Sequence, residues 1–512
     1  GSVSTINFVG DAVVATASAG AAGVSTITIS GSFPADGQEN LVAGSNAGAA
    51  IDSDTCQGVY LGQDAGRYNA AGNLIAIGFA AGCCVTSGAN SIYIGKNAGK
   101  TFTGGNSNII LGNGGRSGVN DGGYNVFLGA EIATGGDTTG DFNIVAGYYA
   151  GYALTSGCCN VLIGQYAGKY LTTGKNNTMV GDNINTGCGS DCMTGCGNAV
   201  IGCLTGNKLT SGNYNALFGP RAGMCLTSGS KNAFMGYYAG GNGFVTGSCN
   251  IAIGVCPGKA LTSGHNNTLL GTNAGKSITD GDYNVILGFC AGEAVTGDTN
   301  IVMGKRSAQC LASGSENIIF GALAGLNLTS GNHNVFIGKC TGQTSDGGFS
   351  KNYNVFIGSY AGENTVNASG NVFLGSLAGQ NTTNGICNTF LGQGAGKGNT
   401  TGDFNVAIGY EVCTPIATGN KQLAIGCNQS HWIVGNSDFN VGIGTTNPNA
   451  AVTSGNTQKL SVGIVSAYQF YGDASQMTGA GFSPDSQENL YAGTGAGANS
   501  DADTCFNIGI GY

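Results

Sequence analysis

Asn334-Val335-Phe336-Ile337-Gly338 decides the fold, because close copies of this stretch return about every 17 residues along most of the chain. Asn371-Val372-Phe373-Leu374-Gly375 is nearly the same. With the glycine taken as an anchor, the motif runs from Gly44 to Gly444 and gives 24 anchors, most of them about 16 to 18 residues apart. A period held this closely is typical of stacked structural units that contact only their neighbours.

Each repeat predicts a strand and two corners. Three apolar residues between Asn and Gly, many of them β-branched or aromatic, favour a short strand. Recurring glycines leave no room for a helix of usual length. A further segment, such as Ala153-Leu154-Thr155-Ser156-Gly157, predicts a short second strand with an inward leucine, followed by a turn. The sequence therefore predicts an all-β protein, an elongated parallel β-solenoid or β-roll of about 24 coils of about 17 residues.

The repeats also divide the chain. We expect an N-terminal β connector at residues 1–39, the repeat array at 40–447, a connector at 448–481 and the start of a second array at 482–512. Residues 482–512 echo residues 33–63, so that Asp52-Ser53-Asp54-Thr55-Cys56 returns as Asp501-Ala502-Asp503-Thr504-Cys505. We therefore expect one long module plus the start of the next, cut from a larger protein.

Composition excludes several classes of protein. Glycine has no three-residue period and only 6 residues are proline, which excludes collagen, and 41% hydrophobic residues argue against disorder. Charged residues make up 9% and the net charge is −9, without the clustered Lys and Arg that nucleic acid binding needs. No apolar stretch is long enough for a membrane span. We expect no nucleic acid partner and no membrane span.

The three strand residues predict which faces are buried. The residue directly before the anchor is always apolar, as in Ile94 and Ile337, and the residue three before it is mostly Val, Ile or Ala, so both are predicted to fill the coil. The residue two before the anchor should then face outward. It is often aromatic, and we expect it to form an interface stripe: Phe127, Phe234, Phe336, Phe356, Phe373 and Phe390.

An outward apolar stripe along a whole rod is too large for a soluble monomer. The simplest remedy is lateral association with identical chains, and we expect a homotrimer around a central axis. Two-fold pairing and a flattened two-layer coil are the alternatives.

The position four before the anchor is Asn in 20 of the 24 units. Stacked Asn side chains can hydrogen-bond from coil to coil and to turn backbone. We predict a structural Asn ladder, represented by Asn125, Asn143, Asn160, Asn215, Asn232, Asn334 and Asn371.

Nineteen cysteines are unusual for such a rod. The adjacent pairs Cys83-Cys84 and Cys158-Cys159 are candidates for interchain disulfides, with unpaired buried thiols as the alternative. A second group, Cys188, Cys192, Cys196 and Cys203, lies around the long interval between Gly181 and Gly202. For this group we expect loop disulfides rather than a metal site, because Cys-x-x-Cys pairs are missing and no His lies nearby.

Enzymatic activity is not predicted. His265, His333 and His431 are the three histidines, and they do not assemble with a nucleophile and an acid. Acidic pairs such as Asp52 and Asp54 lack the ligand count of a known Ca²⁺ loop. We expect no catalytic residues, no metal site and no cofactor.

The repeat resembles the Asn-x-x-x-Gly-x-x-Ala repeats of phage tail fibres and is similar in design to the head repeats of trimeric autotransporter adhesins, which are shorter. The stretches Val441-Gly442-Ile443-Gly444-Thr445-Thr446-Asn447-Pro448 and Phe470-Tyr471-Gly472-Asp473-Ala474-Ser475-Gln476-Met477-Thr478-Gly479 resemble connector modules between arrays in phage fibres. This resemblance implies a homotrimeric structural shaft.

We therefore expect the shaft of an extracellular fibre, most simply a phage tail fibre, located in the virion or at a cell surface. A cell-surface adhesin or an extracellular filament subunit is the alternative, and an ice-binding solenoid is a weaker one. Expected partners are identical chains, other fibre or tail proteins and a host surface receptor. Receptor contact is expected at the inserted loops, around Asn185 to Ala199 and Gly342 to Tyr353.

Overall fold

The computed structural model describes residues 38–443, with gaps at 53–54, 71, 115–120, 136, 187–191, 345–348, 429 and 439. It also describes short strands at 15–19, 25–29, 483–484, 490–492 and 508–510. The chain divides into two units, Gly1–Thr453 and Ser454–Tyr512. The expected connector at 448–481 lies outside the described residues.

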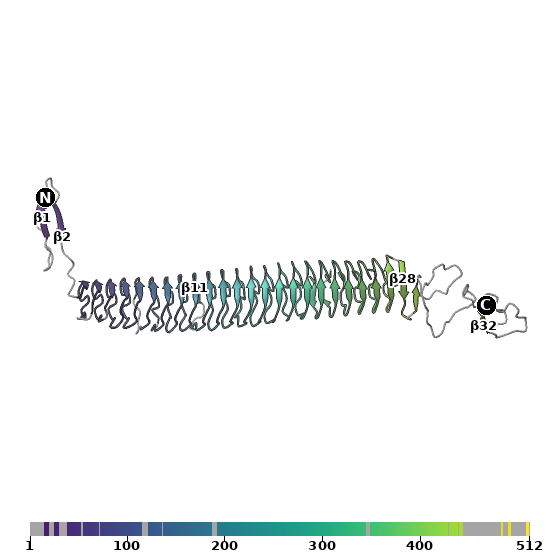
Figure 1. Cartoon of the computed structure of the whole chain (residues 1–512), viewed down its shortest axis with the longest axis horizontal. Coiled ribbons are helices and arrows are strands. Elements are labelled where there is room, and N and C mark those ends of the chain that lie inside the picture. The colour runs from purple at the N-terminus through teal and green to yellow at the C-terminus, as the bar shows by residue number, and fades with distance from the viewer. Residues whose placement is uncertain are drawn as a thin grey trace, which may run out of the picture. The chain divides into compact units, whose positions relative to one another are not determined.

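The first unit is built on one long parallel ladder of three-residue strands (Figure 1). It forms a parallel β-solenoid of about 21 turns, about 17 residues apart, and the described residues contain no helix. The predicted all-β solenoid is confirmed. The strands are β3 (Leu41–Ala43), β4 (Val59–Leu61), β5 (Ile75–Ile77), β6 (Ile92–Ile94), β7 (Ile109–Leu111), β8 (Val126–Leu128), β9 (Ile144–Ala146), β10 (Val161–Ile163), β11 (Thr178–Val180), β12 (Ala199–Ile201), β13 (Ala216–Phe218), β14 (Ala233–Met235), β15 (Ile251–Ile253), β16 (Thr268–Leu270), β17 (Val285–Leu287), β18 (Ile301–Met303), β19 (Ile318–Phe320), β21 (Val335–Ile337), β23 (Val355–Ile357), β24 (Val372–Leu374), β25 (Thr389–Leu391), β26 (Val406–Ile408) and β27 (Leu423–Cys427).

Pairing is in register throughout, with each strand residue opposite its equivalent in the next coil, as in Phe336 opposite Phe356. The row is open rather than closed into a barrel, because β3 pairs with β4 at one end and β29 (Val441–Ile443) pairs with β28 (Ser430–Gly435) at the other. Strand β28 turns back antiparallel against β27, and β29 is antiparallel to β28. The last predicted repeat, ending at Gly444, is therefore not a further parallel coil.

Two small sheets lie near the ends of the chain. Strands β1 (Ala15–Ala19) and β2 (Ser25–Ile29) pair antiparallel within the expected N-terminal connector. In the second unit β30 (Ser483–Pro484) pairs antiparallel with β31 (Leu490–Ala492), and β31 pairs in parallel with β32 (Ile508–Ile510). This parallel pair lies in the segment where a second array is expected.

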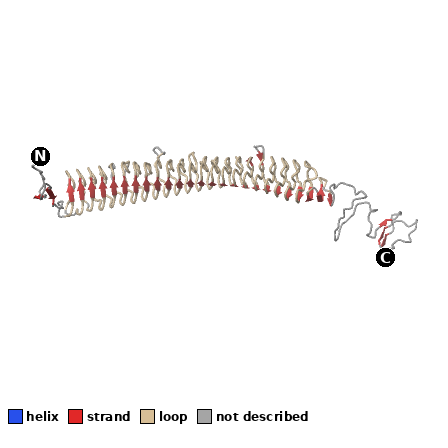
Figure 2. Cartoon of the chain, turned by 90° about the horizontal axis from the view of Figure 1, so that it is seen from above, coloured by secondary structure: helices blue, strands red, loops and turns tan. Residues whose placement is uncertain are grey.

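The strands line one side of the coil, and loops make up most of the rest (Figure 2). The predicted inward leucines are buried, including Leu154, Leu261 and Leu328. The prediction of a second strand is wrong for most coils. The segment forms little more than one backbone hydrogen bond to the next coil, such as that from the Thr262 N–H to the Thr279 carbonyl at 2.9 Å. Only at the second long interval do β20 (Leu328–Ser330) and β22 (Phe349–Ser350) form a strand pair among the described residues.

Left-handed residues turn both corners of each coil. The anchor Gly271 has φ +127°, and a Cβ there would lie 2.6 Å from the Gly288 carbonyl oxygen of the next coil, which explains why glycine is required. Two non-glycine residues per coil also have positive φ, as at Asn273 and Tyr283, both at 57°. Each donates its N–H to the preceding coil, to the Val255 and His265 carbonyls at 2.9 and 3.0 Å. These inter-coil bonds help to hold a conformation that side chains disfavour.

The assignment of strand faces from sequence is wrong. In the ladder strands from β4 to β26, the middle residue points into the coil, and the first and third residues are half-buried or exposed. The residues predicted as an outward interface stripe are fully or almost fully buried: Phe127, Phe234, Phe336, Phe356, Phe373 and Phe390. Because alternate residues of a strand share a face, the middle residue lies on the same side as the Asn four before the anchor. That Asn is also buried.

Inside the coil, four of these rings form a continuous stack. The centroids of Phe336 and Phe356 are 5.0 Å apart, those of Phe356 and Phe373 4.7 Å, and those of Phe373 and Phe390 4.9 Å. Alanines that follow the anchor by three residues fill the space beside them, as Ala361 and Ala378 do at full burial. The core is thus a column of side chains that runs along the solenoid.

Candidate functional site

The predicted Asn ladder exists and is buried. The Asn267 side-chain oxygen accepts the Asn284 N–H at 2.9 Å, and the Asn267 amide nitrogen donates to the Gly281 carbonyl at 2.8 Å and to the Asn250 oxygen at 3.0 Å. The same pattern is repeated at Asn125, Asn143, Asn160, Asn215, Asn232, Asn334 and Asn371. Each Asn therefore ties together two strands and the corner that precedes the next strand.

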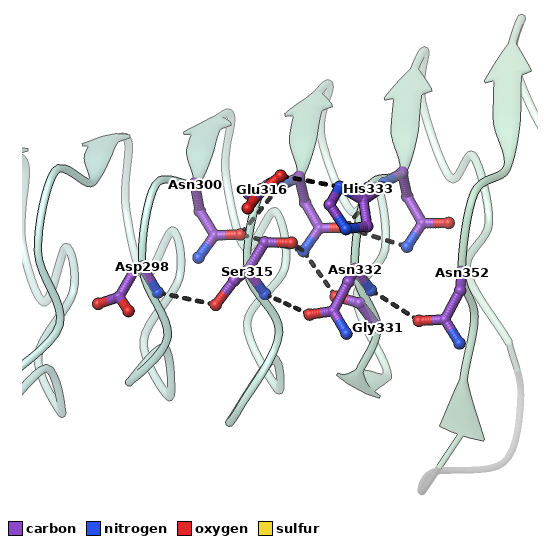
Figure 3. Close-up of polar contacts among 10 residues, drawn as sticks. Asp298, Asn300, Ser315, Glu316, Gly331, Asn332, His333 and Asn352 are labelled. Atoms are coloured by element: carbon purple, nitrogen blue, oxygen red, sulfur yellow. Dashed lines mark hydrogen bonds and ion pairs between the residues drawn. The ribbon is translucent and has the colours of Figure 1, made fainter.

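A second ladder runs along the surface corner that leads into each strand, six residues before the anchor (Figure 3). There the Asp298 N–H donates to the Ser315 hydroxyl at 3.0 Å, the Ser315 N–H to the Asn332 side chain at 2.9 Å, and the Asn332 N–H to the Asn352 side chain at 2.9 Å. His265 and Asp282 continue it. In the Asn ladder the N–H of the later coil donates to the earlier one, whereas here the N–H of the earlier coil donates to the later one.

Sequence reasoning missed this second ladder. Its signal is the recurrence of short acceptors, Asp, Asn, Ser, once His and once Cys, six residues before the anchor. Beside it Glu316 and His333, on adjacent coils, form an ion pair with a nitrogen-to-oxygen distance of 2.8 Å (Figure 3). His333 also stacks on Tyr353, with ring centroids 4.8 Å apart. These two contacts fix His333 within the corner.

The outward side of the strands is apolar. We define the sheet face as the first and third residues of strands β4 to β26. Many of these side chains are exposed even though they are large and hydrophobic: Ile94, Leu111, Leu128, Ile144, Ile163, Ile201, Met235, Ile251, Ile253, Met303, Ile318, Ile357 and Leu374. An outward apolar surface therefore exists, as expected, but other residues form it.

Exposed aromatic residues border the sheet face on both sides. Five residues before the anchor, at the corner that enters the strand, lie Tyr124, Phe142, Tyr214, Tyr283, Tyr353 and Phe404. Directly after the anchor, at the opposite end of the strand, lie Phe79, Tyr148, Tyr237, Phe289 and Tyr410. In this region a shallow hollow of about 480 Å³ is lined by Phe404, Val406, Lys421, Gln422 and Leu423. Rows of exposed aromatic and aliphatic groups on one surface mark it as a place for association.

No family model, no curated protein and no solved structure matches the chain. The resemblance to phage fibre repeats therefore rests on the sequence motifs alone.

The two adjacent cysteine pairs are free thiols within the chain. Cys83 is buried and Cys84 is half-buried, on the corner that follows their strand, whereas Cys158 is half-buried and Cys159 is exposed, on the corner that precedes theirs. Burial raises the pKa of the Cys83 thiol to about 11, with the neighbouring Cys84 adding to the effect, so the reactive thiolate is scarce at neutral pH. Interchain disulfides stay a prediction, which electrophoresis with and without reductant tests directly.

The predicted loop disulfides are not formed among the described cysteines. Cys196 and Cys203 are free thiols, and Cys188 lies outside the described residues. Strand β12 separates Cys196 from Cys203, which places them at opposite ends of one strand. The Cys196 sulfur instead accepts the Lys175 N–H at 3.3 Å, as a member of the surface ladder.

One charged side chain is fully buried in the second long interval. Lys351 takes the place of the glycine that usually precedes the corner, and its Nζ donates to the Gly342 carbonyl at 2.7 Å. The Nζ also lies 5.9 Å from the centre of the Phe336 ring. Burial lowers the pKa of Lys351 to about 7. No signal in the repeat pattern predicts this inward lysine.

The remaining candidate groups are dispersed. Within the described residues, no three His, Cys, Asp or Glu side chains come together as a metal site, and no helix there could cross a membrane. The His431 Nε2–H donates to the Cys413 carbonyl at 3.0 Å, next to the antiparallel end of the sheet. Asp54, Asp501 and Asp503 lie outside the described residues. The centres of both inserted loops expected to contact a receptor lie outside them too.

Proposed function

We propose that this chain is the structural shaft of an extracellular fibre, most simply a phage tail fibre, assembled from identical chains. The observation that carries the proposal is the exposed apolar sheet face, which follows the solenoid from coil to coil. A surface of this kind needs a partner of similar length, and another copy of the same solenoid supplies one. A homotrimer, with three sheet faces turned toward one axis, is the arrangement that we propose.

The connections between coils suit a mechanical role. Two hydrogen-bonded ladders and a buried side-chain column connect each coil to the next, in addition to the strand pairing. Stacked repeats of this kind form extended elements whose coils depend on their immediate neighbours. Attachment to other tail proteins and to a host surface receptor belongs to the same proposal.

Negative-stain electron microscopy combined with light-scattering mass measurement tests the proposal. We expect rods with the mass of three chains. Compact particles, or rods with the mass of one chain at every concentration, would contradict it. The alternative, a cell-surface adhesin or extracellular filament subunit, shares this architecture, and neighbouring tail genes or a membrane anchor in the parent gene would separate the two.

A further inference from the structure

The two ends of the strands carry opposite charge along the middle of the solenoid. We define the basic edge as the corner that follows the strands of coils β15 to β21, and the acidic edge as the corner that precedes them. The basic edge carries Lys259, Lys276, Lys305, Arg306 and Lys339. The acidic edge carries Asp280, Asp282, Asp298 and Glu316.

Few opposite charges interrupt this segregation. Glu293 is the acidic residue on the basic edge of these coils, and Lys276 neutralises it at 3.1 Å. The acidic edge of the same coils has no Lys or Arg among its described residues, only His265 and His333. Lys305, Arg306 and Lys339 are exposed on one edge, and Asp280, Asp298 and Glu316 on the other. Between the two edges lies the apolar sheet face, with Ile251, Ile253 and Met303 exposed.

A strip that is apolar in the centre, basic along one margin and acidic along the other is complementary to itself. Rotation of a copy about an axis parallel to the solenoid turns its sheet face toward the first copy and brings its acidic edge to the basic edge. Rotation about an axis across the solenoid, parallel to the strands, also brings the faces together but reverses the direction of the copy. Such an antiparallel pair always sets like edges together, basic against basic and acidic against acidic.

For two sheet faces to meet with the solenoids antiparallel, one copy must be turned end over end about an axis parallel to the strands. This rotation leaves the basic edge on the same side, so the basic edge of one copy meets the basic edge of the other. Like charges that face each other at an interface repel, which disfavours that arrangement. Parallel copies instead bring the basic edge of this segment against the acidic edge of the same segment, with Lys305 and Arg306 at the level of Asp298.

Resting on the proposed assembly of identical chains, we propose that copies pack side by side in parallel, sheet face to sheet face, with the basic edge of each copy against the acidic edge of the next. This arrangement closes into a ring of two or three chains, and each chain uses both of its edges. The occupant of the sheet face is therefore a second copy in the same orientation.

Charge reversal tests the contact. In the full chain, we expect Lys305→Glu with Arg306→Glu to weaken association at least about tenfold at low salt, measured by sedimentation equilibrium. Asp280→Lys with Glu316→Lys on the acidic edge should weaken it similarly. The quadruple variant should recover much of the loss, because the two edges are then exchanged in sign. Circular dichroism spectra matching the wild type establish that each variant is folded.

Orientation is measured separately. A gold particle bound to a C-terminal histidine tag should mark one end of each assembled rod in electron micrographs. Gold at both ends of a rod overturns the parallel edge-to-edge arrangement, and so does an association constant that no charge reversal changes. Neither result contradicts the fibre proposal. A chain that stays monomeric at all salt and protein concentrations overturns both.

Discussion

Asn267 illustrates how much a single amide does in this fold. Its side chain accepts the Asn284 N–H at 2.9 Å and donates to the Gly281 carbonyl at 2.8 Å, and all three groups lie in the interior. Both backbone groups would otherwise be buried without a partner. The ladder therefore supplies the hydrogen bonds that a corner of a tight coil cannot make by itself.

We predict that Asn267→Ala lowers the free energy of unfolding by about 1 to 3 kcal/mol for each of these two orphaned groups. Asn267→Ser should cost less, because Ser91 occupies the equivalent position naturally and its hydroxyl accepts the Asn108 N–H at 3.1 Å. Urea unfolding followed by circular dichroism measures both variants. Ser263→Ala, on the exposed part of the same coil, is the matched control. Equal losses for Ala at 263 and at 267 would show that the ladder adds no stability.

Lys351 makes stability depend on pH. Its ordinary pKa of 10.5 applies in the unfolded chain, and burial lowers the pKa to about 7 in the folded chain. Between these values the unfolded chain binds a proton that the folded chain does not. The free energy of unfolding should therefore rise with pH from about 7 to 10.5, by at most about 1.4 kcal/mol per pH unit, and this contribution is lost as pH falls toward 7.

Lys351→Met removes the titrating group and fills the same space. We expect the difference in unfolding free energy between the wild type and this variant to change across pH 7, 8 and 9 in urea titrations. Lys339→Met, on the exposed side of the preceding corner, should leave the pH dependence of the wild type intact. A constant difference between wild type and Lys351→Met at all three pH values would refute the assignment.

Among the elements, the stacked strands β21 to β25 depend on their aromatic column. The Phe373 ring lies between Phe356 and Phe390, nearly parallel to both, with interplanar angles of 5° and 6°. The in-register pairing of the strands places these equivalent side chains directly above one another. Burial and stacking both stabilise the column.

We predict that Phe373→Ala destabilises the solenoid by about 3 to 5 kcal/mol, because the coil cannot close around the missing ring. Phe373→Leu should cost much less, since Leu162, Leu217 and Leu269 fill the same position in other coils. Thermal unfolding by calorimetry gives the comparison. Phe244→Ala removes a mostly exposed ring and should have little effect. If Phe373→Ala loses little stability, the ring does not lie in the core, and the outward interface stripe predicted from the sequence would be correct.

The sequence predicted the elements but not their faces. Period, strand position and the Asn ladder follow from the repeat, because in-register stacking requires the same residue at the same place in every coil. Alternation of polar and apolar residues normally reveals which face is buried, and here all three strand residues are apolar, as in Val335, Phe336 and Ile337. The buried Asn, two residues before the middle strand residue, was the available clue to the correct side.

Other parts of the structure carried weaker signals. The left-handed conformation of residues such as Tyr283 cannot be predicted from residue type, because backbone hydrogen bonds to the neighbouring coil hold it. Lys351 breaks the repeat, and a buried lysine is unusual enough that sequence alone favours a surface position for it. The antiparallel β28 and β29 retain an apolar pattern that resembles one more repeat.

For the whole molecule, stacking in register predicts that complete coils can be removed. Deletion of residues 233–300 joins Asn232 directly to Ile301, so that Asn232 takes the ladder position before β18. We expect a folded solenoid shorter by about 19 Å, four strand spacings, with unchanged circular dichroism per residue. Small-angle scattering measures the length.

A deletion of a fractional number of coils is the control. Removal of residues 233–292 places Glu293 after Asn232, which breaks the ladder and shifts apolar residues to the wrong face. We expect this variant to lose cooperative unfolding or to aggregate. If both deletions behave alike, register does not govern the fold.

Because the strands stack in register, the length of the solenoid is set by the number of repeats and can change only in equal steps of one coil. A genetic change that gains or loses whole repeats preserves the in-register contacts on either side of the junction. Length can then evolve without redesign of the interior, while the surface of each coil remains free to diverge.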